Sequence, residues 1–538
     1  MERLDALDVG YQRDNRNHYS AQTAGGGVGT VLVSVAQCLL RSPPSRGLGR
    51  ELATSPGDVK GRAVTSFETR TGGSSVQLVS KWLGWAPRSD HPVDKVLPPG
   101  RLASLGLQHV LVMYAGCVAV PLIVGGALKL DTTTIGLLVN ADLFTAGIAT
   151  LIQAFGIGPF FGVRLPVVAG ATFVAVTPMI LIGSHYGITA MYGALIVAGI
   201  FGVLVARPFS AVLRYFPPVV TGSVITIIGL SLISAATGLI AGNDPTAKSY
   251  AAQHDLVLAG LVLAFIVVVT RFTSGFVSQL AVLGSLVFGT LVAWPMHMLN
   301  FSTVSKAGDF GLSQPLRFGA PTFEASAIIS MIIVILVTFT ESTADMLAVA
   351  EMVDKPISPS DIARGLATDG LSAVLAGFFN SFADTAFAQN VGLVGLTKVR
   401  SRYVVGSAGM ILVVLGVIPK IGQIVANIPG PVIGGAALAM FAMVTAVGIR
   451  TLGKIDFGTS HNLLIVAVSI GVGMMPVVSP NIYEHLPSNL QVIFGSSITS
   501  TLIVVFLLNL LFNEFKWRSP GSPGSQETAS GGSADASS

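Results

Sequence analysis

The sequence predicts an all-α membrane protein that crosses the bilayer many times. Hydrophobic residues make up 51% of its 538 positions and charged residues only 11%, whereas a soluble domain carries about 25% charged residues. Apolar runs of about 20 residues, long enough to cross a bilayer as a helix, recur along most of the chain. The 61 glycines suit close contact between such helices and breaks within them.

The two ends of the chain lack this pattern. Residues 1–100 contain a triple glycine at 25–27 and scattered charges without a sustained period, so we expect disorder there. The apolar run at 28–40 is too short to span a bilayer, and the acidic residues before it fit a signal peptide poorly. An over-extended start site is the alternative explanation. Residues 516–538 are rich in Gly, Ser and Ala and are also expected to be disordered.

Between these ends, over residues 101–515, we predict fourteen membrane spans. Their cores are 104–126, 134–155, 163–182, 188–206, 218–241, 256–272, 276–299, 325–348, 361–379, 383–396, 403–425, 430–449, 460–478 and 490–513. With the N-terminus inside, most Lys and Arg residues of the loops fall on the inner side. The outer loops receive only Lys129, Lys248, Lys306, Arg317 and Lys420. The positive-inside rule therefore favours an even number of spans with both termini in the cytoplasm.

Two of the predicted spans have features of broken helices. The third, at 163–182, contains Pro166, Gly170 and Pro178, and the tenth, at 383–396, is short and polar at its centre. Each is the third span of a seven-span half. Broken segments at matching positions indicate a transporter whose site lies at the interface of inverted repeats. We therefore predict a 7+7 inverted repeat.

Glu341 is the most anomalous residue of the spans. The stretch 332–337 before it is wholly apolar, and an ionised carboxylate at such a place costs several kcal/mol. The carboxylate must therefore bind a proton, meet a cation or bond a ligand, unless it is a structural group bonded to its neighbours. Asp345 shares its helix face four residues later.

Gln389 and Asn390 place two amides in the tenth span. An amide both donates and accepts hydrogen bonds, as do the ring N–H and C=O groups of a neutral nucleobase. Amides thus suit such a base better than a metal or a phosphate, and Gly392 would let backbone approach the ligand. A clamp between helices is the structural alternative.

The remaining polar residues and motifs are less specific. His109 and Asp142 lie in apolar spans, where such residues are more often core groups with satisfied hydrogen bonds than ligands. Asp369 and Asp384 are either packing or functional groups. The sequence has no Walker A motif and no His/Cys cluster, so neither ATP nor a metal cofactor is indicated. Cys38 and Cys117 provide no disulfide framework. A net charge of +4 does not indicate a nucleic-acid partner.

One segment carries a family resemblance. Residues 389–398, QNVGLVGLTK, resemble the signature of the nucleobase–ascorbate transporter family (nucleobase–cation symporter-2), which reads Gln/Glu-Asn-x-Gly, four residues, Thr, then Arg/Lys/Gly. The sequence TEST at 340–343, Gln108-His109, and GATF at 170–173 are also similar to family segments. The resemblance covers about residues 100–515.

The resemblance implies a core domain of spans 1–4 and 8–11 and a gate domain of spans 5–7 and 12–14. Short strands in spans 3 and 10 would pair at the substrate site. Glu341 and Gln389 would bond opposite edges of the base, and main chain near Phe173 would contribute. His109 would support the site from span 1, and Asp369 would match a family carboxylate.

The function implied is symport of xanthine or uric acid with protons across the inner (plasma) membrane. Gln389 favours these oxidised purines over uracil, because uracil carriers of the family tend to have Glu there. The alternatives are a carrier of uracil or another nucleobase, sodium coupling, a channel, or a membrane-embedded enzyme with Glu341 as general base. The expected partners are the base, the proton and the lipid bilayer, with a homodimer as one oligomeric alternative.

Overall fold

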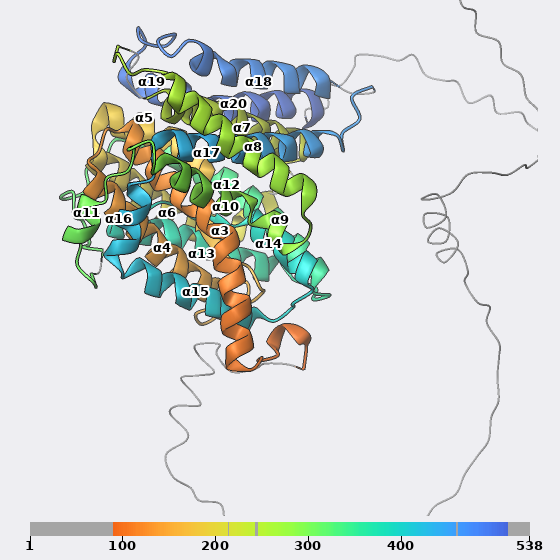
Figure 1. Ribbon diagram of the computed structural model, residues 1–538. Coiled ribbons are helices and arrows are strands. Elements are labelled where there is room, and N and C mark those ends of the chain that lie inside the picture. The colour runs from red at the N-terminus through yellow and green to blue at the C-terminus, as the bar shows by residue number, and fades with distance from the viewer. Residues whose placement is uncertain (1–89, 213–214, 243–245, 312, 459–460, 515–538) are drawn as a thin grey trace, which may run out of the picture. The chain divides into compact units, whose positions relative to one another are not determined.

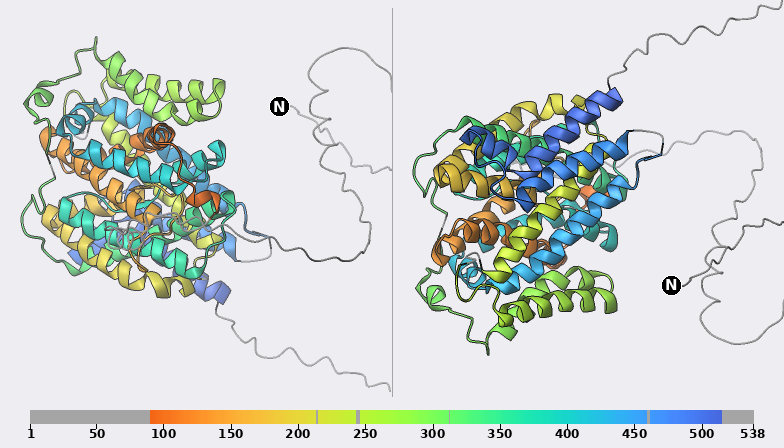
Figure 2. Two further views of the ribbon diagram at one scale, coloured as in Figure 1. Left: turned by 90° about the horizontal axis from the view of Figure 1, so that it is seen from below. Right: turned by 90° about the horizontal axis from the view of Figure 1, so that it is seen from above.

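The computed structural model describes residues 90–514, except 213–214, 243–245, 312 and 459–460 (Figure 1). The predictions for residues 1–89 and 516–538 therefore lie outside the described residues. Figure 2 shows the helical bundle from two further directions. Its elements are, in chain order, η1 (Pro92–Asp94), α3 (Pro99–Ala127), α4 (Thr132–Phe155), β1 (Ala169–Ala171), η2 (Phe173–Ala175), α5 (Val176–Tyr186), α6 (Ile188–Val212), α7 (Pro218–Ala241), α8 (Gln253–Phe272), α9 (Phe276–Gln279), α10 (Ala281–Ala293), α11 (Ser302–Lys306), α12 (Ala325–Met352), α13 (Pro359–Phe379), β2 (Asp384–Ala386), α14 (Ala388–Thr397), α15 (Arg402–Gly416), α16 (Pro419–Ala426), α17 (Gly430–Leu452), α18 (Asn462–Val478), α19 (Ser488–Phe494), α20 (Ser497–Asn509) and η4 (Leu510–Glu514).

The long helices confirm a polytopic membrane protein. Among the described residues, nine helices are long and apolar enough to cross a membrane, or ten if α15 and α16, bent by 80°, form one span. The other predicted spans coincide with shorter helices: α5, α9 with α10, α14, and α18. The span predicted at 276–299 is shorter than expected, because α10 ends at Ala293. The total of fourteen crossings stays a prediction.

Helix ends follow from local sequence signals. Pro stands at the first turn of α3, α7, α13 and α16, where its missing N–H costs nothing. The Asp131 carboxylate accepts from the backbone N–H of Thr134 at 3.0 Å to cap α4. Ser358 and Asp361 form a capping box at the start of α13. These caps satisfy donors that a helix leaves unpaired.

The two predicted broken spans each contain a short strand, as expected. β1 and β2 pair in antiparallel fashion, with Ala169 opposite Ala386, Gly170 opposite Thr385 and Ala171 opposite Asp384. The pairing continues beyond the strands, since the Thr172 N–H donates to the Ala383 carbonyl at 2.8 Å. Each strand then leads into a short helix, α5 after β1 and α14 after β2.

The helices pack in two groups. One group contains α3, α4, α6, α12, α13 and α15, and the other contains α7, α8, α10, α17, α18 and α20. Figure 1 shows α7, α17, α18 and α20 close together, away from α4, α13 and α15. The contacts within the first group follow a repeated pattern, with α4 against α15 and α13 against α6.

Glycines permit these close crossings. A Cβ added to Gly147 would lie 2.8 Å from the Gly409 carbonyl oxygen, and one added to Gly199 would lie 2.7 Å from that of Gly370. The first pair joins α4 to α15 and the second joins α6 to α13. Both crossings therefore bring backbone against backbone, which a side chain would prevent.

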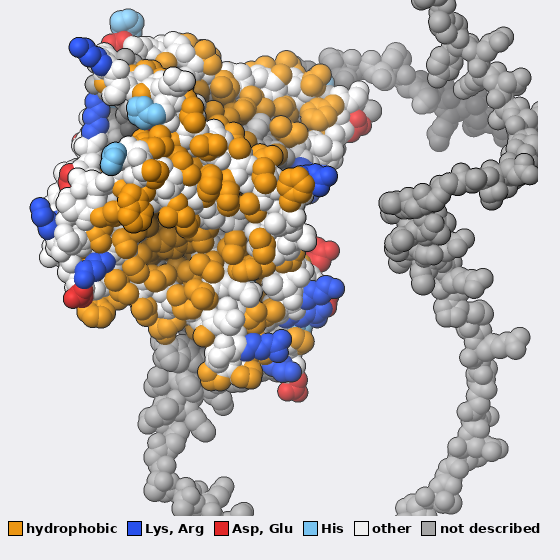
Figure 3. All heavy atoms as spheres, in the orientation of Figure 1, with side chains coloured by type: hydrophobic (Ala, Val, Ile, Leu, Met, Phe, Trp, Pro, Cys, Tyr) orange, Lys and Arg blue, Asp and Glu red, His pale blue; other side chains and the backbone are white. Residues whose placement is uncertain are grey.

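The described surface is suited to lipid. Leu204 is 73% exposed, and Phe272 and Val478 are each 78% exposed. Figure 3 shows apolar side chains over most of the visible face and charged side chains toward its edges. Extended apolar surface of this kind marks contact with a membrane.

The segment before α3 corrects the predicted N-terminal boundary. Residues 90–98 were assigned to the disordered region, but Asp94 is 5% exposed and accepts from Arg402 Nε at 2.6 Å. Arg402 is fully buried and also donates to the Ala154 carbonyl at 3.0 Å. A buried guanidinium needs such partners, so this segment belongs to the membrane unit.

Candidate functional site

The candidate site lies where the two strands become helices. The Thr172 hydroxyl accepts from the Val174 N–H at 3.2 Å and so begins η2 and α5. On the other side, α14 begins at Ala388 directly after β2 and Phe387. Two helix N-termini thus start from one antiparallel pair, and each directs backbone N–H groups and a positive partial charge toward the strands.

Helix α12 is joined to this strand pair beside Glu341. The Ser342 hydroxyl lies 2.8 Å from the Thr385 hydroxyl and accepts from the Ala386 N–H at 3.1 Å. Helix α12 also contacts η2 and α14. These contacts hold Glu341 next to both half-helices.

Glu341 is half-buried, and its carboxylate forms no hydrogen bond to any described residue. Asp345 lies one turn later on the same helix, and a buried oxygen of its carboxylate has no described partner. Both acids interact electrostatically, and Glu341 also interacts with Asp369 of α13. The structure therefore gathers three of the predicted carboxylates.

Asp369 is the best supported of these acids. Its Oδ1 accepts from Gln153 Nε2 of α4 at 3.0 Å. Gln153 also donates to the Gly365 carbonyl at 2.9 Å and accepts from the Val163 N–H at 3.2 Å. This amide ties Asp369 of α13 to α4, and Asp369 is buried rather than exposed.

Gln389 and Gly392 lie on the open side of α14. Both residues are exposed. A Cβ on Gly392 would lie 3.6 Å from Nε2 of Gln279, a residue of α9. The side-chain amide oxygen of Gln279, Oε1, is buried without a hydrogen-bond partner among the described residues. The Gln279 amide therefore lies beside the exposed face of α14 that carries Gln389 and Gly392.

Asn390 faces the opposite way, into the bundle. Its amide nitrogen lies 3.1 Å from His109 Nδ1 and donates to the His109 backbone carbonyl at 3.0 Å. Asn390 and His109 are both buried. This contact joins α14 to α3, so the geometry favours Gln389 as the ligand-facing amide and Asn390 as its support.

Phe173 forms one wall of the site. Its ring meets the ring of Phe441 edge to face, with centroids 5.3 Å apart. Phe441 belongs to α17 and is fully buried. The contact links the strand-bearing group of helices with the other group, beside the strand pair.

Sequence reasoning missed Ser342, Gln153, Phe441 and Gln279. Ser342 stands beside Glu341 and could have been found from that adjacency. Phe441 and Gln279 lie in apolar segments that carry no local signal, because their significance depends on which helix faces them. Gln153 lies near the end of the largely apolar helix α4 and has no visible partner in the sequence.

Among the described residues, no positively charged side chain or metal-binding cluster accompanies the acids of the site. Within the described residues, no Lys or Arg pairs with Glu341, Asp345 or Asp369, and no group of three or more His, Cys, Asp or Glu residues could hold a metal ion. The chemistry available is hydrogen bonding by one carboxylate, two amides, backbone N–H groups and an aromatic face.

Paired half-helices inside an apolar bundle, with polar groups converging at the break, define a secondary transporter. This is the class of protein that the fold and site indicate. Solved structures agree on the fold. The transmembrane domain of the cyanobacterial bicarbonate transporter BicA aligns with a TM-score of 0.50 at 14% identity, covering 76% of this chain and 97% of that one. SLC26A9 aligns with a TM-score of 0.55 at 13% identity, covering 85% of this chain and 72% of that one.

Sequence comparisons show the family. Residues 100–482 match the model of a family described as the permease family. The uric acid transporter UacT of Escherichia coli K12 is 45% identical over 432 residues, covering 80% of this chain and 89% of UacT. A xanthine permease of Bacillus subtilis 168 is 43% identical, covering 77% and 94% of the two chains. The protein belongs to this permease family, the nucleobase–cation symporter-2 transporters, and is a multi-pass transporter rather than an enzyme.

Proposed function

We propose that this protein imports xanthine or uric acid together with protons. The observation that carries the proposal is the pairing of β1 and β2 beside Glu341, with Gln389 exposed at the start of α14. Relatives named for uric acid and xanthine transport support the substrate class.

The donor and acceptor groups fit an oxidised purine. Glu341 and Gln389 lie on elements that flank the strand pair and can bond two edges of one planar base. Backbone N–H groups of η2 add donors for its carbonyl oxygens. The Phe173 ring offers a flat apolar wall against the base. Gly392, which has no side chain, would let a ligand approach the backbone of α14.

Proton coupling would act through Glu341. A lone carboxylate in this apolar surrounding is unfavourable when ionised. A proton lets it donate to the base, so proton and base favour each other's binding. Asp345 and Asp369 interact electrostatically with Glu341, and His109 would support the site through Asn390.

Movement would follow the two groups of helices. In this proposal the group around α3, α4, α12 and α13 would be the core domain, and the group around α7 and α17 would be the gate. The repeated crossings of α4 with α15 and of α6 with α13 support a 7+7 inverted repeat. Alternating access would carry the core past the gate around the Phe173–Phe441 contact.

The remaining assignments extend this proposal. The excess of Lys and Arg in alternate loops favours a cytoplasmic position for both termini. The chain would lie in the plasma (inner) membrane, where a proton gradient is available. Exposed apolar residues of α8 and α18 are compatible with lipid contact or with a homodimer.

The test is uptake of labelled xanthine and urate into proteoliposomes under imposed gradients. We expect a proton gradient to drive accumulation without sodium. Glu341→Gln keeps the shape of the neutral group, so it should bind and exchange substrate without pH-driven accumulation. Gln253→Glu, on the exposed start of α8, is the matched control and should transport normally.

Three outcomes would contradict parts of this proposal. Accumulation driven by sodium alone would replace the coupling ion. Normal, pH-dependent accumulation by Glu341→Gln would remove Glu341 from the coupling step. Preference for uracil in a competition panel of unlabelled bases would overturn the substrate class.

A further inference from the structure

A second group of buried acids lies behind the strand pair, away from Glu341. Asp142 of α4 is fully buried, and Asp384 of β2 is 1% exposed. The two carboxylates interact electrostatically. No described Lys, Arg or His forms an ion pair with either one. Two such acids without a cation cannot both be ionised at modest cost.

Hydrogen bonds distinguish the two acids. Asp142 accepts from the Cys117 thiol at 2.8 Å and from the Ser381 hydroxyl at 3.2 Å. Asp384 has no such support, because neither of its carboxylate oxygens has a hydrogen-bond partner of ordinary geometry among the described residues. The Ser372 hydroxyl accepts from the Asp384 backbone N–H at 3.1 Å and lies close to the carboxylate. Donors favour the charge on Asp142, so a proton belongs on Asp384.

A third element directs a polar group toward this pair. The Tyr192 hydroxyl of α6 is buried without a described partner, and it interacts electrostatically with Asp142. The Tyr192 ring stacks on Phe318, with centroids 5.9 Å apart. An unpaired buried hydroxyl is costly, so its place beside Asp142 points to proton chemistry rather than to packing alone.

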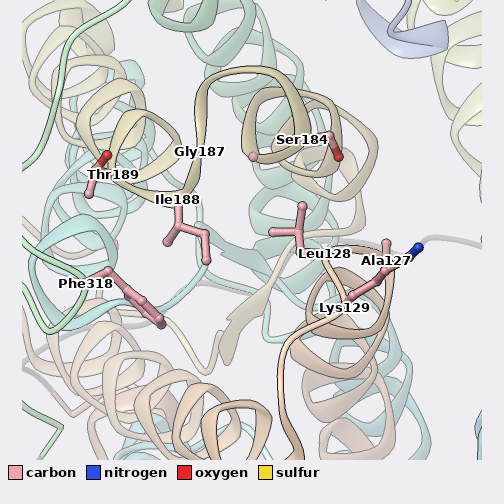
Figure 4. A pocket seen from close by; sticks show the side chains of 9 residues that line it. Ala127, Leu128, Lys129, Ser184, Gly187, Ile188, Thr189 and Phe318 are labelled. Atoms are coloured by element: carbon pink, nitrogen blue, oxygen red, sulfur yellow. The ribbon is translucent and has the colours of Figure 1, made fainter.

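Phe318, on which the Tyr192 ring stacks, also lines a cavity. The cavity has a volume of about 660 Å³ and lies between the ends of α3 and α5 and the start of α6. Figure 4 shows Phe318 and Ile188 on one side of it and Leu128 and Lys129 on the other. The segment carrying Phe318 is tied to the chain just before Ser381, since the Arg317 N–H donates to Asn380 Oδ1 at 2.8 Å.

We propose that Asp384 is a second proton-binding residue, distinct from Glu341, paired with ionised Asp142 and with the buried Tyr192 hydroxyl close by. Because Asp384 lies on β2, its protonation state would affect the pairing of β1 with β2. Asp384 pairs with Ala171, and the next residue, Thr385, bonds Ser342 beside Glu341. Loss of the proton would put a second buried charge on the strand pair and weaken it. Other titratable groups that interact with this pair are Cys117 of α3, Tyr192 of α6 and Asp369 of α13, and Tyr114 of α3 interacts with Cys117.

A cation site is the competing chemistry. The thiol of Cys117 disfavours sodium, which prefers oxygen ligands, and it donates to Asp142 rather than accepting from an ion. The role in transport rests on the proposed function, whereas the protonation of Asp384 can be measured without transport.

Infrared difference spectra of the full-length protein in lipid nanodiscs test the site. A buried carboxylic acid adds a C=O stretch that ionised carboxylates lack. We expect the wild type to show such a band at neutral pH and Asp384→Asn to lose it. Asp369→Asn removes another buried acid, one held by Gln153, and should keep the Asp384 band. Persistence of the band in Asp384→Asn, or its loss on adding sodium at constant pH, would overturn the proposal.

A second measurement needs no change to the acids. In a Cys38→Ser background, Cys117 carries the remaining thiol, and its S–H stretch reports the charge on Asp142. We expect the low frequency of a thiol that donates to an ionised carboxylate, absent after Cys117→Ala. The frequency of a weakly bonded thiol would contradict the assignment of the charge to Asp142.

Binding supplies the functional readout. As the pH rises and Asp384 loses its proton, the urate affinity of the wild type should fall by up to about tenfold per pH unit. Asp384→Asn should flatten that part of the plot of affinity against pH. An unchanged dependence of urate affinity on pH in Asp384→Asn would overturn the proposed effect of Asp384 on the strand pair. Absence of urate binding in the wild type would instead count against the proposed function and leave the spectra interpretable.

Discussion

The side-chain amide of Asn390 reaches both the ring and the backbone of His109, at 3.1 Å from Nδ1 and 3.0 Å from the carbonyl oxygen. One amide thereby joins the half-helix α14 to α3. The neighbouring amide, Gln389, is exposed on the other side of α14. Two adjacent residues of the family signature therefore lie on opposite sides of α14, Asn390 buried against α3 and Gln389 exposed.

Asn390→Asp should impair transport through positioning. A carboxylate cannot donate to the His109 carbonyl, and the mispaired buried groups cost about 1–3 kcal/mol. We expect a lower melting temperature and at least about a tenfold loss of uptake rate. Uptake kinetics and thermal unfolding of the purified protein measure both. Normal stability with selective loss of substrate affinity would instead make Asn390 a direct ligand.

Gln389→Glu should change substrate ranking. An ionised carboxylate accepts hydrogen bonds but cannot donate them, so xanthine and urate should bind about 10- to 100-fold more weakly, by about 1–3 kcal/mol. Uracil should lose less. Competition uptake gives the ranking, with Gln253→Glu as the control for an added charge. An unchanged order of bases would exclude Gln389 from the binding contact.

Phe441→Ala should loosen the wall around Phe173. The aromatic pair contributes about 0.5–1.5 kcal/mol beyond its buried area, and the removed ring leaves space beside the site. We expect weaker xanthine binding and broader acceptance of bulkier purines. Phe265→Ala, which breaks the stacked pair with Phe288 at 4.8 Å between α8 and α10, is the matched control. Equal effects of both changes on specificity would argue against a role for Phe441 in the site.

Gly147→Ala and Gly370→Ala test the repeated crossings. Each new Cβ would lie under 3.0 Å from backbone of the facing helix, and such overpacking costs about 1–3 kcal/mol. Both variants should lose stability to a similar degree, as a repeat predicts. Gly260→Ala on α8 meets nothing within 4 Å and should be neutral or slightly stabilising. Melting temperatures in one detergent give the comparison, and a harmless change at only one crossing would contradict the equivalence.

Asp94 should mark where the essential chain begins. Removing it leaves the buried Arg402 guanidinium without its carboxylate, a loss of about 3–5 kcal/mol. Asp94→Ala should therefore reduce the folded, membrane-inserted fraction. Deletion of residues 2–80 should preserve insertion and uptake, because their composition cannot build a core. Loss of inserted protein in that deletion would show that the N-terminal region contributes to folding.

The sequence by itself determined the membrane class, the positions of the helices and the two anomalous polar segments. Hydropathy is a local property, so an apolar run of bilayer length predicts its own burial. Glu341 and Gln389 were found because polar groups inside such runs are costly and need a reason. The breaks at Gly170 and in span 10 followed from proline, glycine and polarity.

Only the tertiary structure decided which groups meet. The pairing of β1 with β2, the contact of Asn390 with His109 and the meeting of Phe173 with Phe441 join residues that are more than 200 positions apart. The sequence likewise did not show that Asp142 has two hydrogen-bond donors while the Asp384 carboxylate has no described partner. The hydropathy of a segment indicates how much of its own apolar surface must be buried. Which segments become its neighbours depends on how all the other segments pack.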